Sequence, residues 1–220
     1  EGNTSGFGQA DLYISFNQNG YWSIPVNLGS EINSAQNDFC PTIFNNDTLI
    51  FARSQKVGDE LVEQIYSTKI NNPSLKALAT LKPTAVFDEI FIDGDVYGIS
   101  FSSDGKYAYT TRSTADRSVC EIYRLEITSD GSFINPKKID IWQITSNVSN
   151  PVISHDNTFA LLRISETSKD PDLYISKKDI QGDWQKPVPL SENINTTIDQ
   201  YYPELTAEKH LYYSSNGDVF

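Results

Sequence analysis

The sequence predicts an all-β protein built from a repeated unit of four antiparallel strands. The segment from Trp22 to Pro41 recurs 162 residues later as the segment from Trp184 to Pro203, with identical residues at seven of its 20 positions. A marker triplet, made of an acidic or amide residue, an aliphatic residue and an aromatic residue, recurs at 11–13, 64–66, 121–123, 172–174 and 218–220. The apolar runs between the marker triplets are short and lack the 3.6-residue period of an amphipathic helix.

Each unit is expected to contain a strand, a tight turn, a second strand, a loop, a third strand at the marker triplet and a last strand at the Trp-x-x-Pro element. The first strands are expected after Pro41, Ile99, Pro151 and Pro203. The offset of 162 is three times 54. A β-propeller blade of four antiparallel strands takes about 40 to 50 residues, so the repeat predicts a β-propeller with about four blades in this chain. A jelly roll or an immunoglobulin-type sandwich would not repeat its Trp, Pro and Asn three units later.

The same residues resemble a known repeat. Asp11 to Ser15, Trp22 to Gly29 and then Pro41 are similar to the WD-like propeller repeat of TolB-like bacterial envelope proteins, and the copy from Asp172 to Ser215 is similar nearly as closely. The two middle units lack a Trp-x-x-Pro element. The resemblance implies a β-propeller in a periplasmic or exported envelope protein. It implies little about activity, because one fold hosts many functions.

The repeat predicts a single propeller domain over 1–220. Its units are expected at about 30–82, 83–142, 143–190, and 200–220 together with 1–29 if the ring closes. Closure would leave no sheet edge open. The alternative is part of a larger ring, because 218–220 already resembles the third strand of its own blade. The chain begins in the middle of a repeat and has no methionine, so we expect a processed or excerpted chain.

Composition limits the partners. A net charge of -12, from 17 basic and 29 acidic residues, opposes binding to nucleic acid or to an anionic membrane by charge repulsion. No apolar stretch approaches the roughly 20 residues that cross a bilayer, so no membrane-spanning segment is expected. No cofactor is expected either. The remaining partners are a protein or peptide, or an anionic or sugar ligand.

No catalytic residue is expected. The two histidines, His155 and His210, lie in a turn and just before a strand, and no nucleophile-elbow, zinc-protease or phosphate-loop motif is present. Cys40 and Cys120 lie in different units, where one disulfide or, more in keeping with their spacing, two buried thiols would be possible.

The acidic residues leave two alternatives. Four of them, Asp88, Glu89, Asp93 and Asp95, crowd into eight residues, which is either a calcium loop or, as we expect, a solvated linker without metal. A propeller glycosidase would use a pair of carboxylates on inner strands, but Glu204 is the only acidic residue on the segments expected there.

The repeat places an arginine at the same strand end in three units, at Arg53, Arg112 and Arg163, with Ser215 in the fourth. Loops expected on that face bring further polar and aromatic residues, and the predicted ligand site includes Asp38, Asp199, Tyr201 and Tyr97. Guanidinium groups around an opening would suit a carboxylate-bearing peptide or a sugar acid. The alternative is that the arginines form salt bridges between blades with the same aspartates.

The aromatic residues divide in a similar way. Trp22 and Trp184 recur with the repeat, so we expect both to pack between adjacent blades. Tyr97 and Tyr201 are expected in loops, where they could stack on a ligand. Together these features predict a non-enzymatic binding or scaffolding propeller of the bacterial envelope that recognises a protein or peptide on its loop-rich face. The alternative is a propeller enzyme acting on carbohydrate with loop carboxylates as acid and base.

Overall fold

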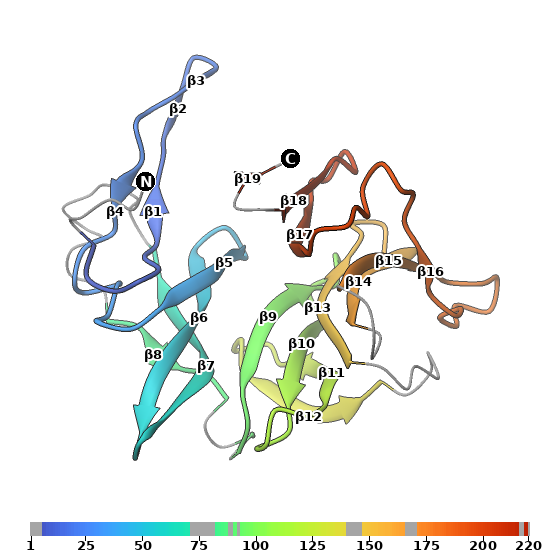
Figure 1. Ribbon diagram of the computed structural model, residues 1–220, viewed down its shortest axis with the longest axis horizontal. Helices are drawn as coiled ribbons and strands as arrows, with labels where there is room; N and C mark the ends of the chain where they lie inside the picture. Colours follow the sequence, from blue (N-terminus) through green and yellow to red (C-terminus); the bar gives the residue numbers. More distant parts are fainter. Residues whose placement is uncertain are drawn as a thin grey trace. The chain divides into compact units, whose positions relative to one another are not determined.

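The computed structural model describes residues 6–70, 82–87, 90–91, 93–139, 147–165, 171–215 and 218–219. The described residues form strands and turns without helices, so none of them belongs to a helix that could cross a membrane (Figure 1). The chain divides into two compact units, Glu1–Asp88 and Glu89–Phe220. We describe each unit by itself, and the organisation as one propeller domain stays a prediction.

Unit 1 contains a long hairpin and one complete four-stranded sheet. In the hairpin, β1 (Tyr13–Ile14) pairs with β4 (Val26–Asn27), and β2 (Asn17–Gln18) pairs with β3 (Tyr21–Trp22). The sheet has the order β5-β6-β7-β8 with antiparallel neighbours, and its strands are β5 (Asp38–Phe44), β6 (Thr48–Val57), β7 (Glu60–Lys69) and β8 (Thr84–Ala85).

Unit 2 contains two four-stranded antiparallel sheets and a three-stranded one. The first comprises β9 (Val96–Phe101), β10 (Tyr107–Ser113), β11 (Cys120–Ile127) and β12 (Phe133–Lys138). The second comprises β13 (Asn147–Ile153), β14 (Phe159–Ser165), β15 (Asp172–Lys177) and β16 (Val188–Pro189), and the third comprises β17 (Gln200–Leu205), β18 (Leu211–Ser215) and β19 (Asp218–Val219). These sheets confirm the predicted all-β class and the four-stranded antiparallel blade. The marker triplets at 64–66, 121–123 and 172–174 lie on third strands, whereas the triplet at 11–13 reaches β1 of the hairpin.

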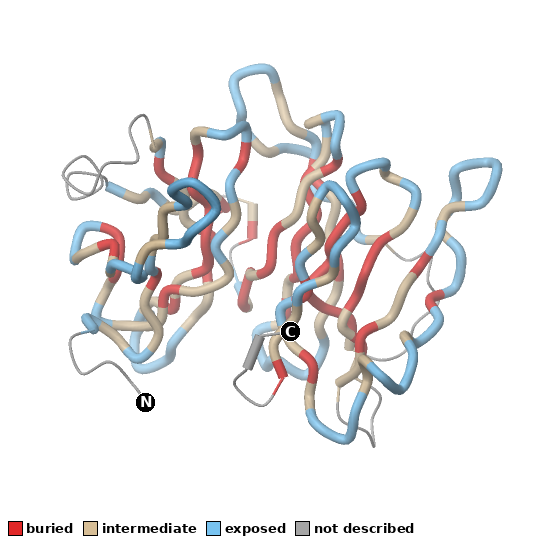
Figure 2. The backbone as a smooth tube through the Cα atoms, turned by 90° about the horizontal axis from the view of Figure 1, so that it is seen from above, coloured by how far each residue is buried: buried red, intermediate tan, exposed pale blue. Residues whose placement is uncertain are grey.

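Three second strands, β6, β10 and β14, are largely buried because they lie in the middle of their sheets. Residues 49–52 of β6 and 160–162 of β14 are all buried, whereas the turns that follow first strands are mostly exposed (Figure 2). Continuous burial of this kind requires side chains that are apolar on both faces of the strand. The short runs of aliphatic and aromatic residues in the sequence satisfy this requirement.

Each first strand contains a bulge at the same place. The pairing register shifts around Cys40, Gly98, Asn150 and Tyr202, and all four residues have a positive φ between 49° and 61°. Three of them stand directly before the prolines that the repeat marks. A bulge increases strand twist and removes the extra residue from the ladder, so proline can follow it without breaking a hydrogen bond.

Gly98 also allows β9 and β13 to approach closely. A Cβ at this position would lie 3.0 Å from the Nδ2 atom of Asn150. Asn150 is held in turn, because its backbone N–H donates to Thr111 Oγ1 at 2.9 Å. Glycine at 98 is therefore favoured by its positive φ and also by the closeness of the neighbouring strand, which sets it apart from the other three bulge residues.

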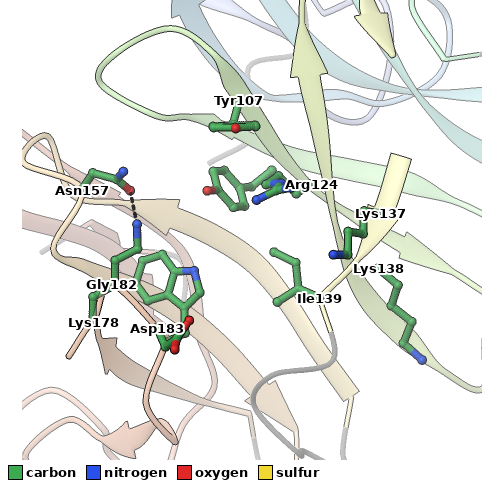
Figure 3. A pocket seen from close by; sticks show the side chains of 11 residues that line it. Tyr107, Arg124, Lys137, Lys138, Ile139, Asn157, Lys178, Gly182 and Asp183 are labelled. Carbon is green, nitrogen blue, oxygen red and sulfur yellow. Dashed lines mark hydrogen bonds between the residues drawn. The ribbon is translucent and has the colours of Figure 1, made fainter. Parts of the chain in front are cut away.

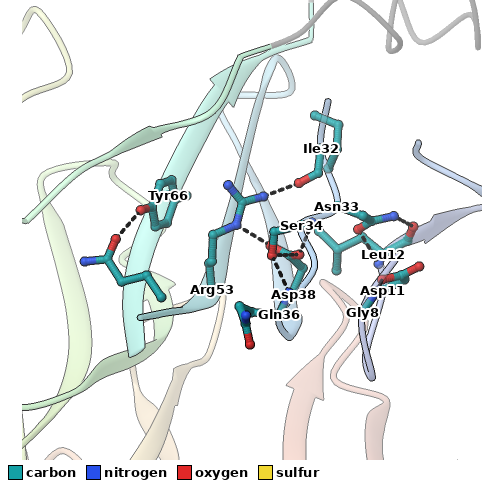
Figure 4. A network of polar contacts seen from close by, with 11 residues as sticks. Gly8, Asp11, Leu12, Ile32, Asn33, Ser34, Gln36, Asp38, Arg53 and Tyr66 are labelled. Atoms are coloured by element: carbon teal, nitrogen blue, oxygen red, sulfur yellow. Dashed lines mark hydrogen bonds and ion pairs between the residues drawn. The ribbon is translucent and has the colours of Figure 1, made fainter. Parts of the chain in front are cut away.

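The asparagine that recurs in the 162-residue repeat, at 33 and 195, has the same structural role in both copies. Asn33, 1% exposed, accepts from the backbone N–H of Leu12 at 2.8 Å and donates to the carbonyl oxygen of Leu12 at 2.9 Å (Figure 4). Asn195 makes the same pair of bonds with Leu173, at 3.0 and 2.9 Å. In both copies the amide holds the aliphatic residue of the marker triplet in the core.

The two repeated tryptophans differ in their surroundings. Trp184 is partly buried against two clusters, which include Tyr109 and Ile122 of one sheet and Leu162 of the next. Trp22, on β3, is 71% exposed. The expectation that both pack between blades is therefore wrong for Trp22. Its hairpin extends past the β1–β4 pair, and the buried cluster of unit 1 contains Leu12 and Leu28 from the base of the hairpin but no residue from its tip.

We predict that Asn33→Ala lowers the free energy of unfolding by about 1 to 3 kcal/mol, because the N–H of Leu12 is left buried without an acceptor. Urea denaturation measures the change. Gln18→Ala, which removes an exposed amide on β2, is the matched control and should change stability by less than about 0.5 kcal/mol. Equal effects of the two substitutions would show that the Asn33 bonds contribute little.

We also predict that Gly98→Ala destabilises the protein more than Gly105→Ala. Both glycines have φ near +60°, at 61° and 67°, but a Cβ at Gly105 would meet nothing within 4 Å. Each substitution should cost about 1 to 2 kcal/mol for the left-handed backbone, and only Gly98→Ala adds the contact with Asn150. Thermal melts of the two variants would contradict this reason if Gly105→Ala were equally or more destabilising.

Candidate functional site

Arg53 lies at the end of a polar network in unit 1. Its Nε atom donates to Asp38 Oδ1 at 2.6 Å, and its Nη2 atom donates to the carbonyl oxygen of Ile32 (Figure 4). The Asp38 side chain is 0% exposed and also accepts from the backbone N–H and the hydroxyl of Ser34. The guanidinium lies over the ring of Tyr66, 4.7 Å from its centre. Arg53 therefore neutralises a fully buried carboxylate.

Arg112 occupies the equivalent place on β10 in unit 2. It pairs with Asp93 and lies 5.7 Å from the ring centre of Phe91 and 5.9 Å from that of Tyr123. Its Nε atom is buried and has no hydrogen-bond acceptor among the described residues. Asp95, the next acidic residue, pairs with Arg117 at 2.6 Å. Asp88 and Glu89, the rest of the acidic cluster, lie outside the described residues.

Arg163 contacts two of the residues that the repeat groups with it. Its Nε atom donates to the carbonyl oxygen of Gln200 at 3.2 Å, its Nη2 atom lies 4.0 Å from Asp199 Oδ2, and its guanidinium lies 4.6 Å from the ring centre of Tyr201. Tyr201 donates its hydroxyl hydrogen to Asp199, and this bond raises the pKa of the tyrosine. Arg163 thus links the end of β14 to the start of β17.

Tyr97 and Tyr201 lie in strands, where the sequence places them in loops. Tyr97 is the second residue of β9, and its hydroxyl lies 3.5 Å from Cys120 Sγ. Tyr201 is the second residue of β17. The loop expectation is wrong because the first strands begin before the bulges, at residues that the proline markers do not include. Tyr97 does not join any of the arginine clusters in these contacts.

The three arginine clusters contain the same kinds of groups. Each guanidinium has an aspartate and an aromatic ring beside it, and Arg53 and Arg163 also donate to a backbone carbonyl. The ion pair of Arg53 lies within one sheet, because Asp38 is opposite Arg53 across the β5–β6 ladder. Arg163 lies 4.0 Å from Asp199, which directly precedes the next sheet, so among the described residues Arg163 comes nearest to the expected salt bridge between blades. Binding of a ligand by these residues stays a prediction.

A cavity of about 550 Å³ lies elsewhere in unit 2, where the sheets β9–β12 and β13–β16 meet (Figure 3). Its walls include three aromatic side chains, from Tyr107 and Tyr109 on β10 and from Trp184. One carboxylate, Asp183, is among its lining residues. Aromatic walls with a few polar groups are typical of small-molecule sites of this size.

Four basic residues line the same cavity, namely Arg124, Lys137, Lys138 and Lys178. The Arg124 guanidinium lies over the ring of Tyr107 at 4.5 Å from its centre, and the Lys178 ammonium lies over Trp184 at 4.7 Å. Lys178 also donates to Asn157 Oδ1 at 3.1 Å (Figure 3). Lys138 pairs with Glu121 at 2.6 Å.

The sequence did not reveal this cavity because its residues come together only through the packing of two sheets. Arg124 is opposite Tyr109 across the β10–β11 ladder, whereas Lys178 and Trp184 flank a turn of the next sheet. The available signals are the basic doublets 137–138 and 177–178 in an acidic chain, and the repeated Trp184. Neither signal indicates that the two regions meet.

Comparisons with known proteins identify the fold. Neither a protein-family model nor the sequence of a curated protein matches this chain. A structure described as a putative TolB from Agrobacterium tumefaciens is similar with a TM-score of 0.50 and 18% identity, over 94% of this chain and 68% of that chain. The periplasmic gluconolactonase PpgL of Pseudomonas aeruginosa is similar with a TM-score of 0.56 and 13% identity, over 97% of this chain and 63% of that chain.

The chain thus spans about two thirds of the length of both structures, and at these identities the likeness concerns the fold alone. Its sheets have the strand number, antiparallel order and repeat spacing that the sequence predicts for propeller blades. This chain has the TolB-like β-propeller fold.

Proposed function

We propose that this chain is a non-enzymatic β-propeller of the bacterial cell envelope that binds a protein or peptide partner. The observation that carries the proposal is the hairpin β1–β4 of unit 1. From Leu12 to Ser30 it has no charged residue, in a chain where 21% of residues are charged. Near its tip, Tyr21 is 82% exposed, Trp22 71% and Ile24 86%.

The fold does not require these apolar residues. At the positions 162 residues later, unit 2 has Asp183 in place of Tyr21 and Lys186 in place of Ile24, and both of these charged residues are exposed. Exposed aromatic and aliphatic groups without nearby charges are typical of the centre of a protein interface. The partner should therefore present an uncharged, apolar surface to the hairpin.

The hairpin is also well formed for such a role. Asn19 and Gly20, at its two-residue turn, have φ of 55° and 88°, as a type I′ turn requires. Ser15 and Ser23 are joined by a hydrogen bond of 2.6 Å from the Ser15 hydroxyl to the Ser23 carbonyl. A hairpin that is ordered before binding loses less conformational entropy when it binds.

The proposed envelope location and the preference for binding over catalysis are supported by separate observations. The sequence resemblance to TolB-like envelope proteins supports the location. A glycosidase would need two carboxyl groups about 5 to 10 Å apart across its site. Among the described residues, a single carboxylate, that of Asp183, lines the cavity of unit 2. This favours binding over the carbohydrate-enzyme alternative.

We predict that Tyr21→Ser/Ile24→Ser weakens partner binding by about thirtyfold, the factor for a lost hot-spot contribution of about 2 kcal/mol. The partner is first identified by cross-linking in an envelope extract, then purified, and its Kd is measured by calorimetry. Both substituted side chains are exposed, so thermal stability should change little.

Ile180→Ser is the matched control, because Ile180 is 97% exposed at the corresponding turn of unit 2. It should leave the Kd unchanged. If the hairpin variant binds every cross-linked protein as tightly as Ile180→Ser does, the hairpin is not the binding surface. Loss of self-association in light scattering, without loss of any other partner, would instead assign the hairpin to contacts between copies of the chain.

The arginine clusters give a separate prediction. Arg53→Gln should lower the free energy of unfolding by about 3 kcal/mol, because Asp38 is left buried without a counter-charge. Arg163→Gln should cost about 1 kcal/mol or less, since Asp199 is 28% exposed and 4.0 Å away. Lys56→Gln, an exposed change of charge on the same strand as Arg53, controls for net charge in the urea melts. A stable Arg53→Gln protein with weakened partner binding would support the ligand role instead.

A further inference from the structure

The cavity of unit 2 is lined by several cationic side chains that form no ion pair within the described part of the chain. Arg124, Lys137 and Lys178 line it, and none of them forms an ion pair with a carboxylate of the described residues. The whole chain has 29 acidic and 17 basic residues. Cations outside an ion pair are therefore unexpected in this protein, and three such cations of the described residues line one cavity, beside a single described carboxylate, Asp183.

Two of these cations also disfavour each other. The pKa of Lys178 is lowered, first by burial and then by the positive charge of Arg124, whereas the charge of Asp104 acts in the opposite direction. Placing like charges together in a partly buried site costs free energy unless an anion lies nearby. The aromatic rings under Arg124 and Lys178 keep both groups in place despite this cost.

The other walls provide contact area for more than a bare ion. Tyr107, Tyr109, Ile139 and Trp184 form apolar and aromatic surface in a volume of about 550 Å³, within the usual range of about 300 to 1,000 Å³ for small-molecule sites. A guanidinium binds carboxylate and phosphate groups in a fixed planar geometry, and an ammonium binds them as a point charge. Together the walls suit an anion that also carries a ring or chain.

We propose that this cavity binds a small organic anion, with a carboxylate or phosphate group between Arg124 and Lys178 and the rest of the molecule against Tyr107 and Trp184. The anion neutralises two cations that have no ion-pair partner among the described residues. The site uses other residues than the hairpin proposed for the protein partner, so either proposal can fail without the other.

The test is calorimetric titration of the whole chain with glucuronate, glucose 1-phosphate, inorganic phosphate and neutral glucose. At least one of the two organic anions should bind saturably and more tightly than inorganic phosphate, with weaker binding at higher salt. Glucose should not bind. Arg124→Gln and Lys178→Gln should each weaken binding at least tenfold, as expected for the loss of one charge-assisted hydrogen bond.

Lys177→Gln is the matched control. It removes the same charge one residue away from Lys178, at an exposed position that does not line the cavity, and it should leave binding nearly unchanged. Thermal melts establish that each variant is folded, and the Arg124 and Lys178 variants test the site independently of each other.

Three outcomes would overturn the proposal. One is that neither organic anion binds at up to about 10 mM, a concentration that detects a Kd near 1 mM. Another is that glucose binds as tightly as the organic anions, which would show that the negative charge is not recognised. Equally tight binding of inorganic phosphate would show that the organic part is not recognised. The third is that the cavity variants bind no more weakly than Lys177→Gln, which would place the anion elsewhere.

Discussion

The amide side chains of Asn33 and Asn195 pair with a buried backbone as a neighbouring strand would. Each accepts from the N–H and donates to the C=O of the aliphatic residue in a marker triplet, at Leu12 and at Leu173, and each of these carbonyls also accepts a backbone hydrogen bond, from Leu28 or from Leu190. A buried backbone group without a hydrogen-bond partner lowers the free energy of unfolding by about 1 to 3 kcal/mol. The apolar cluster of unit 1 depends on this, because Leu12 can pack beside Ile32 and Phe51 only if its own polar groups are paired.

The charges of the chain follow two different rules. At Arg53 and Arg163 a cation is matched with a carboxylate and a backbone carbonyl, so the charge contributes to holding strand ends together. In the cavity of unit 2, Arg124 and Lys178 are held by aromatic rings and an amide, and neither forms an ion pair with a described carboxylate. Aromatic faces can orient a cation and still leave it available to an anion. This difference separates the cations that stabilise the fold from those that suit a ligand.

Much of the fold could be predicted because the repeat specifies it several times. The marker triplets give the third strands, the prolines give the first strands, and the common register places Arg163 near Asp199 and Tyr201. The surroundings of single side chains were harder to predict. Trp22 and Trp184 share the Trp-x-x-Pro-Val-x-Leu pattern, but Trp184 packs against residues of two sheets whereas Trp22 is exposed. The cavity could not be predicted, since Arg124 and Lys178 meet through sheet packing rather than through any spacing in the sequence.

The four bulges of the first strands have a consequence for how such a chain can change. Cys40, Gly98, Asn150 and Tyr202 share one backbone conformation, although their side chains differ in size and chemistry. Three of these residue types are not glycine, so the surrounding strands hold the conformation and outweigh its local preference. At Cys40, Asn150 and Tyr202 the backbone conformation is thus set by the surrounding strands and does not depend on which side chain is present. Substitution at those three positions leaves the backbone path unchanged, whereas at Gly98 an added side chain meets Asn150.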